Sequence, residues 1–450
     1  MIKLSKTALI LTIGQATEPS IKRINKLNPD LVYFIHSTKS KENALFIIEE
    51  TNIKNYKFKQ LDDHESVDDS FMKSLECINE LKEDYEIIGD FTVGTKPMVS
   101  GLVMACIDQE CQIVYLGESD ENSRHDGMGP VISGQEKTKD QENPYENYAI
   151  NEFRSGREFF NKYQFIAAHE NFNNAEMKLK YDDLKERSKI FVKIVRFYDA
   201  WDKFNDELDE IPLNEYLQNI ILNKINSKEN LKSYFENEIP SFYKQMINNK
   251  RFLDKKLINK PSESISYYLP DLLNNAHRRI NEGKYDDAVA RLYRAMELIS
   301  QIRLNQYNIL DKNQINDTKT FFVDKEKLRK RLSKSGIAEV DNMNINGWKN
   351  DNIDFLDFDS GRNYKLLNII SKESKYDLSD STKKLVTNYY KINHQVQRRN
   401  TSILAHGLRP LNKKEANNLF KLVLNHSKKL CNNIEKEMDL AKFPLFEEGD

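Results

Sequence analysis

Short apolar runs alternate with amphipathic stretches over the first 120 residues. Near-continuous apolar runs are typical of strands that are buried on both faces of a parallel sheet. Strands that alternate with helical segments indicate an α/β architecture. We therefore predict a Rossmann-like parallel sheet over residues 1–140, whose ligand would bind at the carboxyl ends of the strands. The five predicted strands cover residues 7–13, 31–37, 56–61, 85–92 and 111–118.

From about residue 143 the pattern changes to apolar positions at helical spacing. The clearest case is a stripe over residues 285–302, and its members are Tyr285, Ala288, Leu292, Ala295, Ile299 and Ile302. Residues 306–379 are polar and poorly periodic, which indicates an insertion or a mobile segment. We predict an all-α middle region over 141–264 and an α-helical domain over 265–450.

Composition adds limits on the partners. The 68 basic and 70 acidic residues nearly cancel, so the chain has no global basic field of the kind that binds duplex DNA. Any nucleic-acid contact must come from a local patch. No apolar run is long enough to cross a bilayer. Four cysteines without metal-ligand spacing indicate reduced thiols and a cytoplasmic location; they are Cys77, Cys106, Cys111 and Cys431.

The fourth predicted strand leads into the sequence DFTVGTKPMVSG, residues 90–101. Gly94, Thr95 and Lys96 precede Pro97, which suits the first turn of a helix. Backbone amides at a helix start, a hydroxyl and an ammonium group together form an anion site. The spacing fits neither a P-loop nor a dinucleotide fingerprint. The alternative is ordinary turn chemistry, because every parallel sheet has polar loops at this edge.

Two further loops should lie at the same edge of the sheet. Thr12 lies at the end of the first predicted strand, Gln15 follows that strand, and Ser37 ends the second. Their strand positions alone make these residues candidates for ligand binding.

The stretch RRNTSILAHG, residues 398–407, carries the candidate chemistry of the helical half. Arg399 and His406 are seven residues apart, so a continuous helix would present both on one face. No metal-ligand set accompanies them. An arginine and a histidine suit cleavage of RNA by its own 2′-hydroxyl, because histidine transfers protons near neutral pH and arginine stabilises phosphorane charge. The alternative is a basic helix face with an incidental histidine.

Three motifs together carry a family resemblance. RNTSILAHG resembles the Arg-x4–6-His signature of HEPN ribonucleases, and VGTKPM resembles the ligand loop of CARF domains. The segment GKYDDAVARLYRAMELISQIRL resembles the helical region of CRISPR-associated CARF–HEPN proteins. The chain thus resembles the CARF–HEPN ribonuclease family of type III CRISPR systems, over roughly residues 5–135 and 265–440.

The resemblance implies a CARF domain at 1–140, a helical linker domain at 141–264 and a HEPN domain at 265–450. It implies an endoribonuclease in antiviral defence that cleaves single-stranded RNA without a metal or other cofactor, leaving 2′,3′-cyclic phosphates. The activator would be cyclic tetra-adenylate or cyclic hexa-adenylate, bound across a homodimer; neither DNA nor a membrane would be a partner.

Site roles follow residue by residue from the same resemblance. Arg399 and His406 match the catalytic pair, and Asn400 matches the polar position after the arginine. Thr95 and Lys96, with Gly94 before them, match the ligand loop. Two other functions stay open: a non-catalytic regulator that senses the nucleotide, and a ring nuclease whose CARF domain degrades its ligand.

Overall fold

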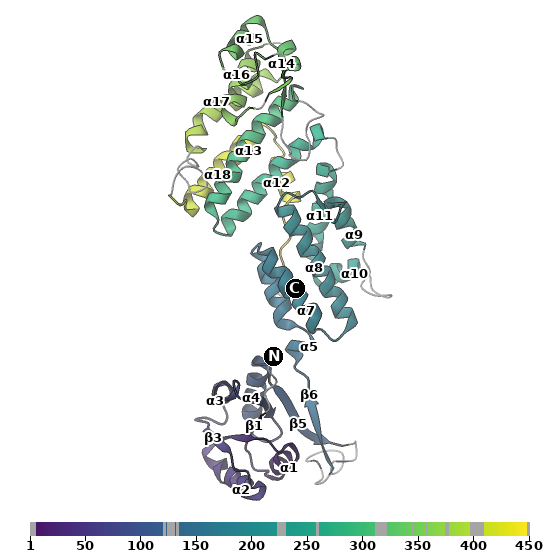
Figure 1. The fold of residues 1–450 in the computed structure, drawn as a ribbon, viewed down its shortest axis with the longest axis vertical. Helices are drawn as coiled ribbons and strands as arrows, with labels where there is room; N and C mark the ends of the chain where they lie inside the picture. The colour runs from purple at the N-terminus through teal and green to yellow at the C-terminus, as the bar shows by residue number, and fades with distance from the viewer. Residues whose placement is uncertain are drawn as a thin grey trace. The chain divides into compact units, whose positions relative to one another are not determined.

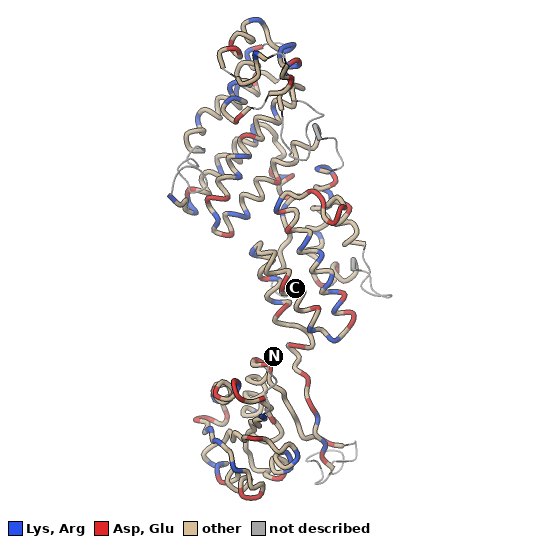
Figure 2. Tube along the Cα trace, viewed as in Figure 1, with Lys and Arg blue, Asp and Glu red and all other residues tan. Residues whose placement is uncertain are grey.

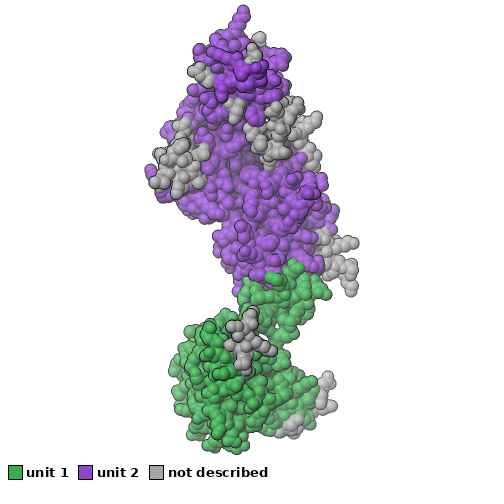
Figure 3. Space-filling view, viewed as in Figure 1, with its two compact units in different colours: residues 1–152, 175–185 green, residues 153–174, 186–450 purple. Residues whose placement is uncertain are grey.

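The computed structural model divides into two compact units, residues 1–152 with 175–185 and residues 153–174 with 186–450 (Figure 3). The described residues are 6–119, 123, 131, 135–222, 231–257, 261–310, 322–343, 345–350, 352–356, 358–373, 378–396 and 409–447.

The first unit contains a six-stranded sheet in the order β3-β2-β1-β4-β5-β6. Five strands run parallel, and β6 pairs antiparallel with β5. The five predicted strands are confirmed. The sixth was not predicted, because its sequence EKTKDQ has no apolar residue. The strands are β1 (Thr7–Thr12), β2 (Leu31–His36), β3 (Tyr56–Gln60), β4 (Glu86–Asp90), β5 (Gln112–Glu118) and β6 (Glu136–Gln141).

Helices cover both faces of this sheet (Figure 1). Alternate residues of β1 point to opposite faces: Ala8 and Ile10 pack with α3 and α4, whereas Leu9 and Leu11 pack with α1 and α2. The strand order reverses between β1 and β4, which makes this pair the topological switch point where ligands of such sheets bind. The helices are α1 (Glu18–Leu27), η1 (Thr38–Ser40), α2 (Lys41–Thr51), α3 (Val67–Leu81), α4 (Lys96–Asp108) and α5 (Pro144–Asn147).

The second unit begins with helices around an aromatic core. Trp201, Tyr198, Phe191, Phe197 and Phe242 are all buried there. Its elements are α6 (Ile150–Asn161), α7 (Phe165–Lys178), α8 (Asp182–Asp202), β7 (Glu207–Leu208), β8 (Ile211–Pro212), α9 (Leu213–Ile221), α10 (Leu231–Glu238) and α11 (Pro240–Leu257), with α6, α7 and α8 shared between the two units. We call this group the middle helices.

The remaining helices pack around α13, which contacts α12, α16, α17 and α18. The predicted apolar stripe lies on α13 and faces the core, with Tyr285 half-buried and the other members buried. The elements are α12 (Pro261–Asn281), α13 (Tyr285–Gln306), β9 (Val323–Asp324), α14 (Lys325–Arg331), α15 (Lys334–Asp341), β10 (Phe355–Leu356), α16 (Ser360–Lys372), α17 (Ser379–Val396), α18 (Lys413–Ser427) and α19 (Ile434–Leu440).

The described part of segment 306–379 is folded. Leu328 and Trp348 belong to the same core as α13, and Trp348 Nε1 donates a 2.6 Å hydrogen bond to Asp341. Its status as an insertion, like the predicted domain boundaries, stays a prediction. None of the helices in the described ranges is both long and apolar enough to cross a bilayer.

After α19 the chain returns to the middle helices. Phe443 and Phe446 are buried in their aromatic core. Asn161 of α6 donates to the Phe446 carbonyl at 2.8 Å and accepts from the Phe446 amide at 2.9 Å. The C-terminal residues therefore tie the middle helices to the last helices of the chain.

Candidate functional site

The loops after β1 and β4 meet at the topological switch point. Thr12 Oγ1 donates a hydrogen bond to the Val93 carbonyl. Gly94 has a φ of +134°, and a Cβ there would lie 2.7 Å from Thr12 Oγ1. Gly14 lies against the same backbone, because a Cβ on it would be 3.2 Å from the Gly94 nitrogen. The close approach of the two loops therefore requires glycine at position 94.

Thr95 and Lys96 follow at the start of α4. Thr95 is the N-cap: its Oγ1 accepts from the Met98 amide at 3.3 Å and donates to the His64 carbonyl at 2.7 Å. Its hydroxyl is thus engaged by the protein. Lys96 is exposed and forms no ion pair with another described residue. Lys96 and the first amides of α4 therefore provide the positive character of this edge.

Ser37 and Gln15 complete the predicted set. The Ser37 hydroxyl accepts from the Ser40 amide at 3.2 Å and caps η1, so this predicted ligand group also has a structural partner. Gln15 is exposed in the loop after β1. Asn43 of α2, which the sequence analysis did not single out, donates to the Gly14 carbonyl at 2.8 Å and holds that loop. The binding roles of all these residues stay predictions.

A buried ion pair lies at the base of the β4 loop. Arg23 Nε of α1 donates to Asp90 Oδ2 at 2.7 Å, and only 4% of Arg23 is exposed. Asp90 Oδ1 accepts from the Thr92 amide at 2.8 Å, and Arg23 Nη1 donates to Thr138 of β6 at 3.0 Å. This ion pair connects α1, the end of β4 and β6, and thus fixes the start of the candidate ligand loop.

The predicted catalytic residues Arg399, Asn400 and His406 lie outside the described residues. The structure describes the two flanking helices, α17 ending at Val396 and α18 beginning at Lys413. Both helices pack against α13.

The chain that follows the Arg–His motif is attached to α13 and α18. The Leu411 amide donates to Asp286 Oδ2, in the first turn of α13, at 3.4 Å. Asn412 then forms a reciprocal capping box with Glu415: the Glu415 amide donates to Asn412 at 3.0 Å, and the Asn412 amide donates to Glu415 at 3.2 Å. The C-terminal flank of the motif therefore has a defined position.

A buried histidine joins four of these helices. Asn388 Nδ2 of α17 donates to His426 Nδ1 at 2.8 Å, so the His426 proton is on Nε2 and is donated to Tyr364 Oη of α16 at 2.9 Å. The Tyr364 hydroxyl donates to the Met296 carbonyl of α13 at 3.0 Å. Burial, together with Lys429, lowers the pKa of His426 to about 3. His426 is therefore neutral and structural, and the sequence analysis gave no sign of it.

Residues 258–430 match the family model of the Csm6 HEPN domain. The match spans α12 to α18, and a Rossmann-like sheet precedes it in the chain. The helical C-terminal part of the chain is thus similar to the HEPN domain of CRISPR-associated Csm6 proteins. We call the region that matches the family model the HEPN domain. We call the N-terminal sheet with its helices the CARF domain, after the resemblance of its VGTKPM loop to CARF ligand loops.

Solved structures with a similar fold include Csm6 from Enterococcus italicus bound to cyclic hexa-2′-fluoro-hexa-dAMP. Its sequence is 12% identical, the alignment covers 97% of this chain and 100% of that chain, and the TM-score is 0.49. Can2 from Sulfobacillus thermosulfidooxidans in complex with cyclic tetra-adenylate has 12% identity, coverages of 59% and 67%, and a TM-score of 0.24. A type III CRISPR defence DNA nuclease activated by cyclic oligoadenylate has 13% identity, coverages of 44% and 34%, and a TM-score of 0.23. No curated protein matches the chain. Because these TM-scores are below 0.5, the likenesses carry no weight for its activity.

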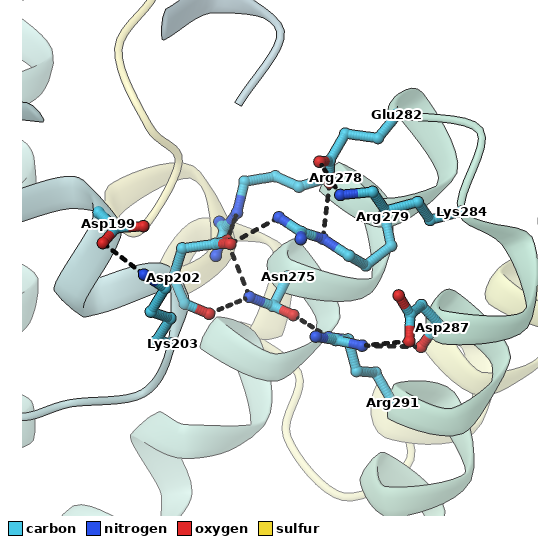
Figure 4. A network of polar contacts seen from close by, with 10 residues as sticks. All are labelled: Asp199, Asp202, Lys203, Asn275, Arg278, Arg279, Glu282, Lys284, Asp287 and Arg291. Atoms are coloured by element: carbon cyan, nitrogen blue, oxygen red, sulfur yellow. Dashed lines mark hydrogen bonds and ion pairs between the residues drawn. The ribbon is translucent and has the colours of Figure 1, made fainter. Parts of the chain in front are cut away.

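The HEPN domain is joined to the middle helices by a buried polar network (Figure 4). Asp202, in the last turn of α8, accepts from three side chains of α12: Asn275 at 2.9 Å, Arg278 at 2.7 Å and Arg279 at 2.6 Å. Arg291 of α13 donates in turn to Asn275 Oδ1. Asp202 and both α12 arginines are buried. Arg278 depends on Asp202 for its compensation, whereas Arg279 also pairs with Glu282 at 2.7 Å.

Within the described ranges, no three or more His, Cys, Asp or Glu side chains are grouped so that they could hold a metal ion.

Proposed function

We propose that this protein is an endoribonuclease of type III CRISPR antiviral defence that cleaves single-stranded RNA without a metal when a cyclic oligoadenylate binds its CARF domain. The match of residues 258–430 to the Csm6 HEPN domain carries the proposal. The motif RNTSILAHG supports it, because it supplies an arginine and a histidine at the HEPN spacing within the matched region.

The chemistry uses the RNA 2′-hydroxyl as nucleophile. The 2′-oxygen bonds to the adjacent phosphorus, the bond to the 5′-oxygen breaks, and the products are a 2′,3′-cyclic phosphate and a 5′-hydroxyl. His406 transfers the proton that leaves the nucleophile or enters the leaving group. Arg399 stabilises the charge on the phosphorane oxygens, and Asn400 orients the pair. A homodimer brings two such motifs to one composite site.

The activator site lies at the carboxyl edge of the CARF sheet. Lys96, the amides at the start of α4 and the glycine loop before them provide the contacts for the phosphates of cyclic tetra-adenylate or cyclic hexa-adenylate. Thr12, Gln15 and Ser37 lie on the loops of the neighbouring strands β1 and β2. The buried pair of Arg23 and Asp90 keeps the loop in place when the ligand binds.

Titration of each ring size into an RNase assay tests the proposal. We expect cleavage of a labelled single-stranded RNA that rises with one ring size and is absent without ligand. Binding of a cyclic oligoadenylate without RNA cleavage at any ring size would contradict the proposed activity and favour a non-catalytic regulator.

A further inference from the structure

The helix α17 has one buried and one exposed face. Leu385, Val386, Tyr389 and Ile392 are buried in the core around α13. The exposed side chains recur at spacings of three, four and seven residues and therefore form one stripe; they are Asp380, Lys383, Lys384, Thr387, Tyr390, Lys391 and His394.

This stripe is basic and contains one exposed aromatic ring. The only acidic residue of α17 is Asp380, which lies 3.8 Å from Lys383. Lys384 and Lys391 form no ion pair with any residue that the structure describes. Tyr390 is 50% exposed, and Tyr389 is its one aromatic neighbour in the described ranges, with 5.4 Å between ring centroids. In a chain of net charge −2, this face is a local basic patch.

The helix on the other side of the Arg–His motif repeats the charge pattern. Lys413, Lys414 and Lys421 of α18 are exposed, and Glu415, the one acidic residue of this helix, is held by the N-cap and by Arg409 at 3.0 Å. α17 and α18 pack against each other. Figure 2 colours every described Lys and Arg blue along the trace, including the segments that Figure 1 labels α17 and α18. The charge therefore concentrates on both helices that flank the motif.

We propose that the exposed face of α17 binds single-stranded RNA, with Tyr390 stacking on a base and Lys384 and Lys391 contacting phosphates; this inference rests on the proposed ribonuclease function. Proteins bind single strands by combining cationic side chains with aromatic rings on which bases stack. A duplex hides its base faces and does not offer this contact.

The position of Tyr390 connects this face to the chemistry. Tyr390 lies six residues before the end of α17 at Val396, about 9 Å along the helix axis at the usual rise per residue. Arg399 follows three residues later in the sequence. The RNA contact proposed for α17 is therefore close to the motif in the sequence, and it is sequence-tolerant because every base has a stacking face.

The test uses the full-length protein with its activating ring and a fluorescein-labelled 12-nucleotide 2′-O-methyl RNA, which has no free 2′-hydroxyl and cannot be cut. Fluorescence anisotropy gives the dissociation constant. Tyr390→Ala should weaken binding by roughly 5- to 100-fold through lost stacking. Tyr390→Phe keeps the ring and should bind like wild type, which separates stacking from a role of the hydroxyl.

The lysines have a separate readout in the salt dependence of binding. The double variant Lys384→Ala/Lys391→Ala should reduce the slope of log K against log salt concentration by about 1.4, since each single-strand phosphate contact contributes about 0.7. Lys244→Ala is the matched control: this lysine of α11 is exposed and without an ion pair among the described residues, and its removal should leave the slope unchanged.

Wild-type affinity of Tyr390→Ala for the probe would overturn the inference. Sedimentation of Tyr390→Ala gives a second check. If this variant loses both probe binding and its dimer, the exposed face of α17 is an interface between two copies, and the inference is wrong. The proposed function is judged separately, by cleavage of unmodified RNA by wild type. Efficient cleavage without any effect of the α17 variants counts against this inference alone.

Discussion

The buried histidine of the HEPN domain makes its stability sensitive to acid. His426 is fully buried, and burial together with Lys429 lowers its pKa from 6.5 to about 3. Between these values the unfolded chain binds a proton at this position and the folded protein does not. The free energy of unfolding therefore falls as the pH falls below 6.5 and stops falling, for this residue, near pH 3.

The size of the effect follows from how far the pH lies below 6.5, the pKa of this histidine in the unfolded chain. One pH unit corresponds to about 1.36 kcal/mol, so His426 should cost the folded state about 2 kcal/mol at pH 5 relative to pH 7.5. Carboxylates also titrate in this range, and a variant is needed to isolate the histidine. His426→Gln removes the titration while keeping an amide donor for Tyr364 and an acceptor for Asn388.

The assay is urea unfolding followed by tryptophan fluorescence. Both tryptophans, Trp201 and Trp348, are buried in the unit that contains His426, so the signal reports this unit and not the CARF sheet. Between pH 7.5 and 5, wild type should lose about 2 kcal/mol more than His426→Gln. Equal losses of unfolding free energy in the two proteins would refute the conclusion that His426 is neutral in the folded protein.

Three further substitutions test other parts of the account. Lys96→Ala should raise the ring concentration needed for half-maximal RNase activity by roughly tenfold or more, because a charge-assisted contact to phosphate contributes about 1.5–3 kcal/mol; calorimetry with unchanged affinity would remove this lysine from the site. Gly94→Ala should weaken ring binding as well, because its Cβ would lie 2.7 Å from Thr12 Oγ1 at a φ of +134°; calorimetry showing wild-type affinity would mean that the loop tolerates the change. Asp202→Asn should destabilise the second unit by about 3–5 kcal/mol, since the buried Arg278 loses its counter-charge and Arg279 keeps only Glu282; a urea midpoint equal to that of wild type would contradict this.

The parts of the fold that could be predicted depend on apolar periodicity. The five parallel strands are continuous apolar runs, and the stripe on α13 has helical spacing, so burial is visible in the sequence. β6 carries no such signal, because EKTKDQ has no apolar residue and pairs with β5 as an edge strand. In a parallel sheet the carboxyl ends of all strands lie at the same edge. The proximity of the loops that contain Thr12 and Gly94 could therefore be expected as well.

The partners of individual polar side chains could not be predicted. Arg23 and Asp90 are 67 residues apart, and in the sequence each resembles an ordinary surface charge. The hydroxyls of Thr95 and Ser37 are at the expected edge but cap helices, a use that depends on local backbone geometry. His426 is one histidine of eight, and only the packing of four helices gives it a role.

Metal-independent RNA cleavage by the Arg–His motif is the activity that we propose for this protein. The most direct measurement is cleavage of a labelled single-stranded RNA, with the activating ring and EDTA present, by wild type, Arg399→Ala and His406→Ala. We predict that wild type cuts in EDTA, leaves 2′,3′-cyclic phosphates and spares a DNA of the same sequence. Each substitution should slow the reaction by at least about 10²-fold, the usual scale for acid–base and electrostatic catalysis. Cutting by His406→Ala at the wild-type rate, or loss of wild-type cutting in EDTA, would contradict the account.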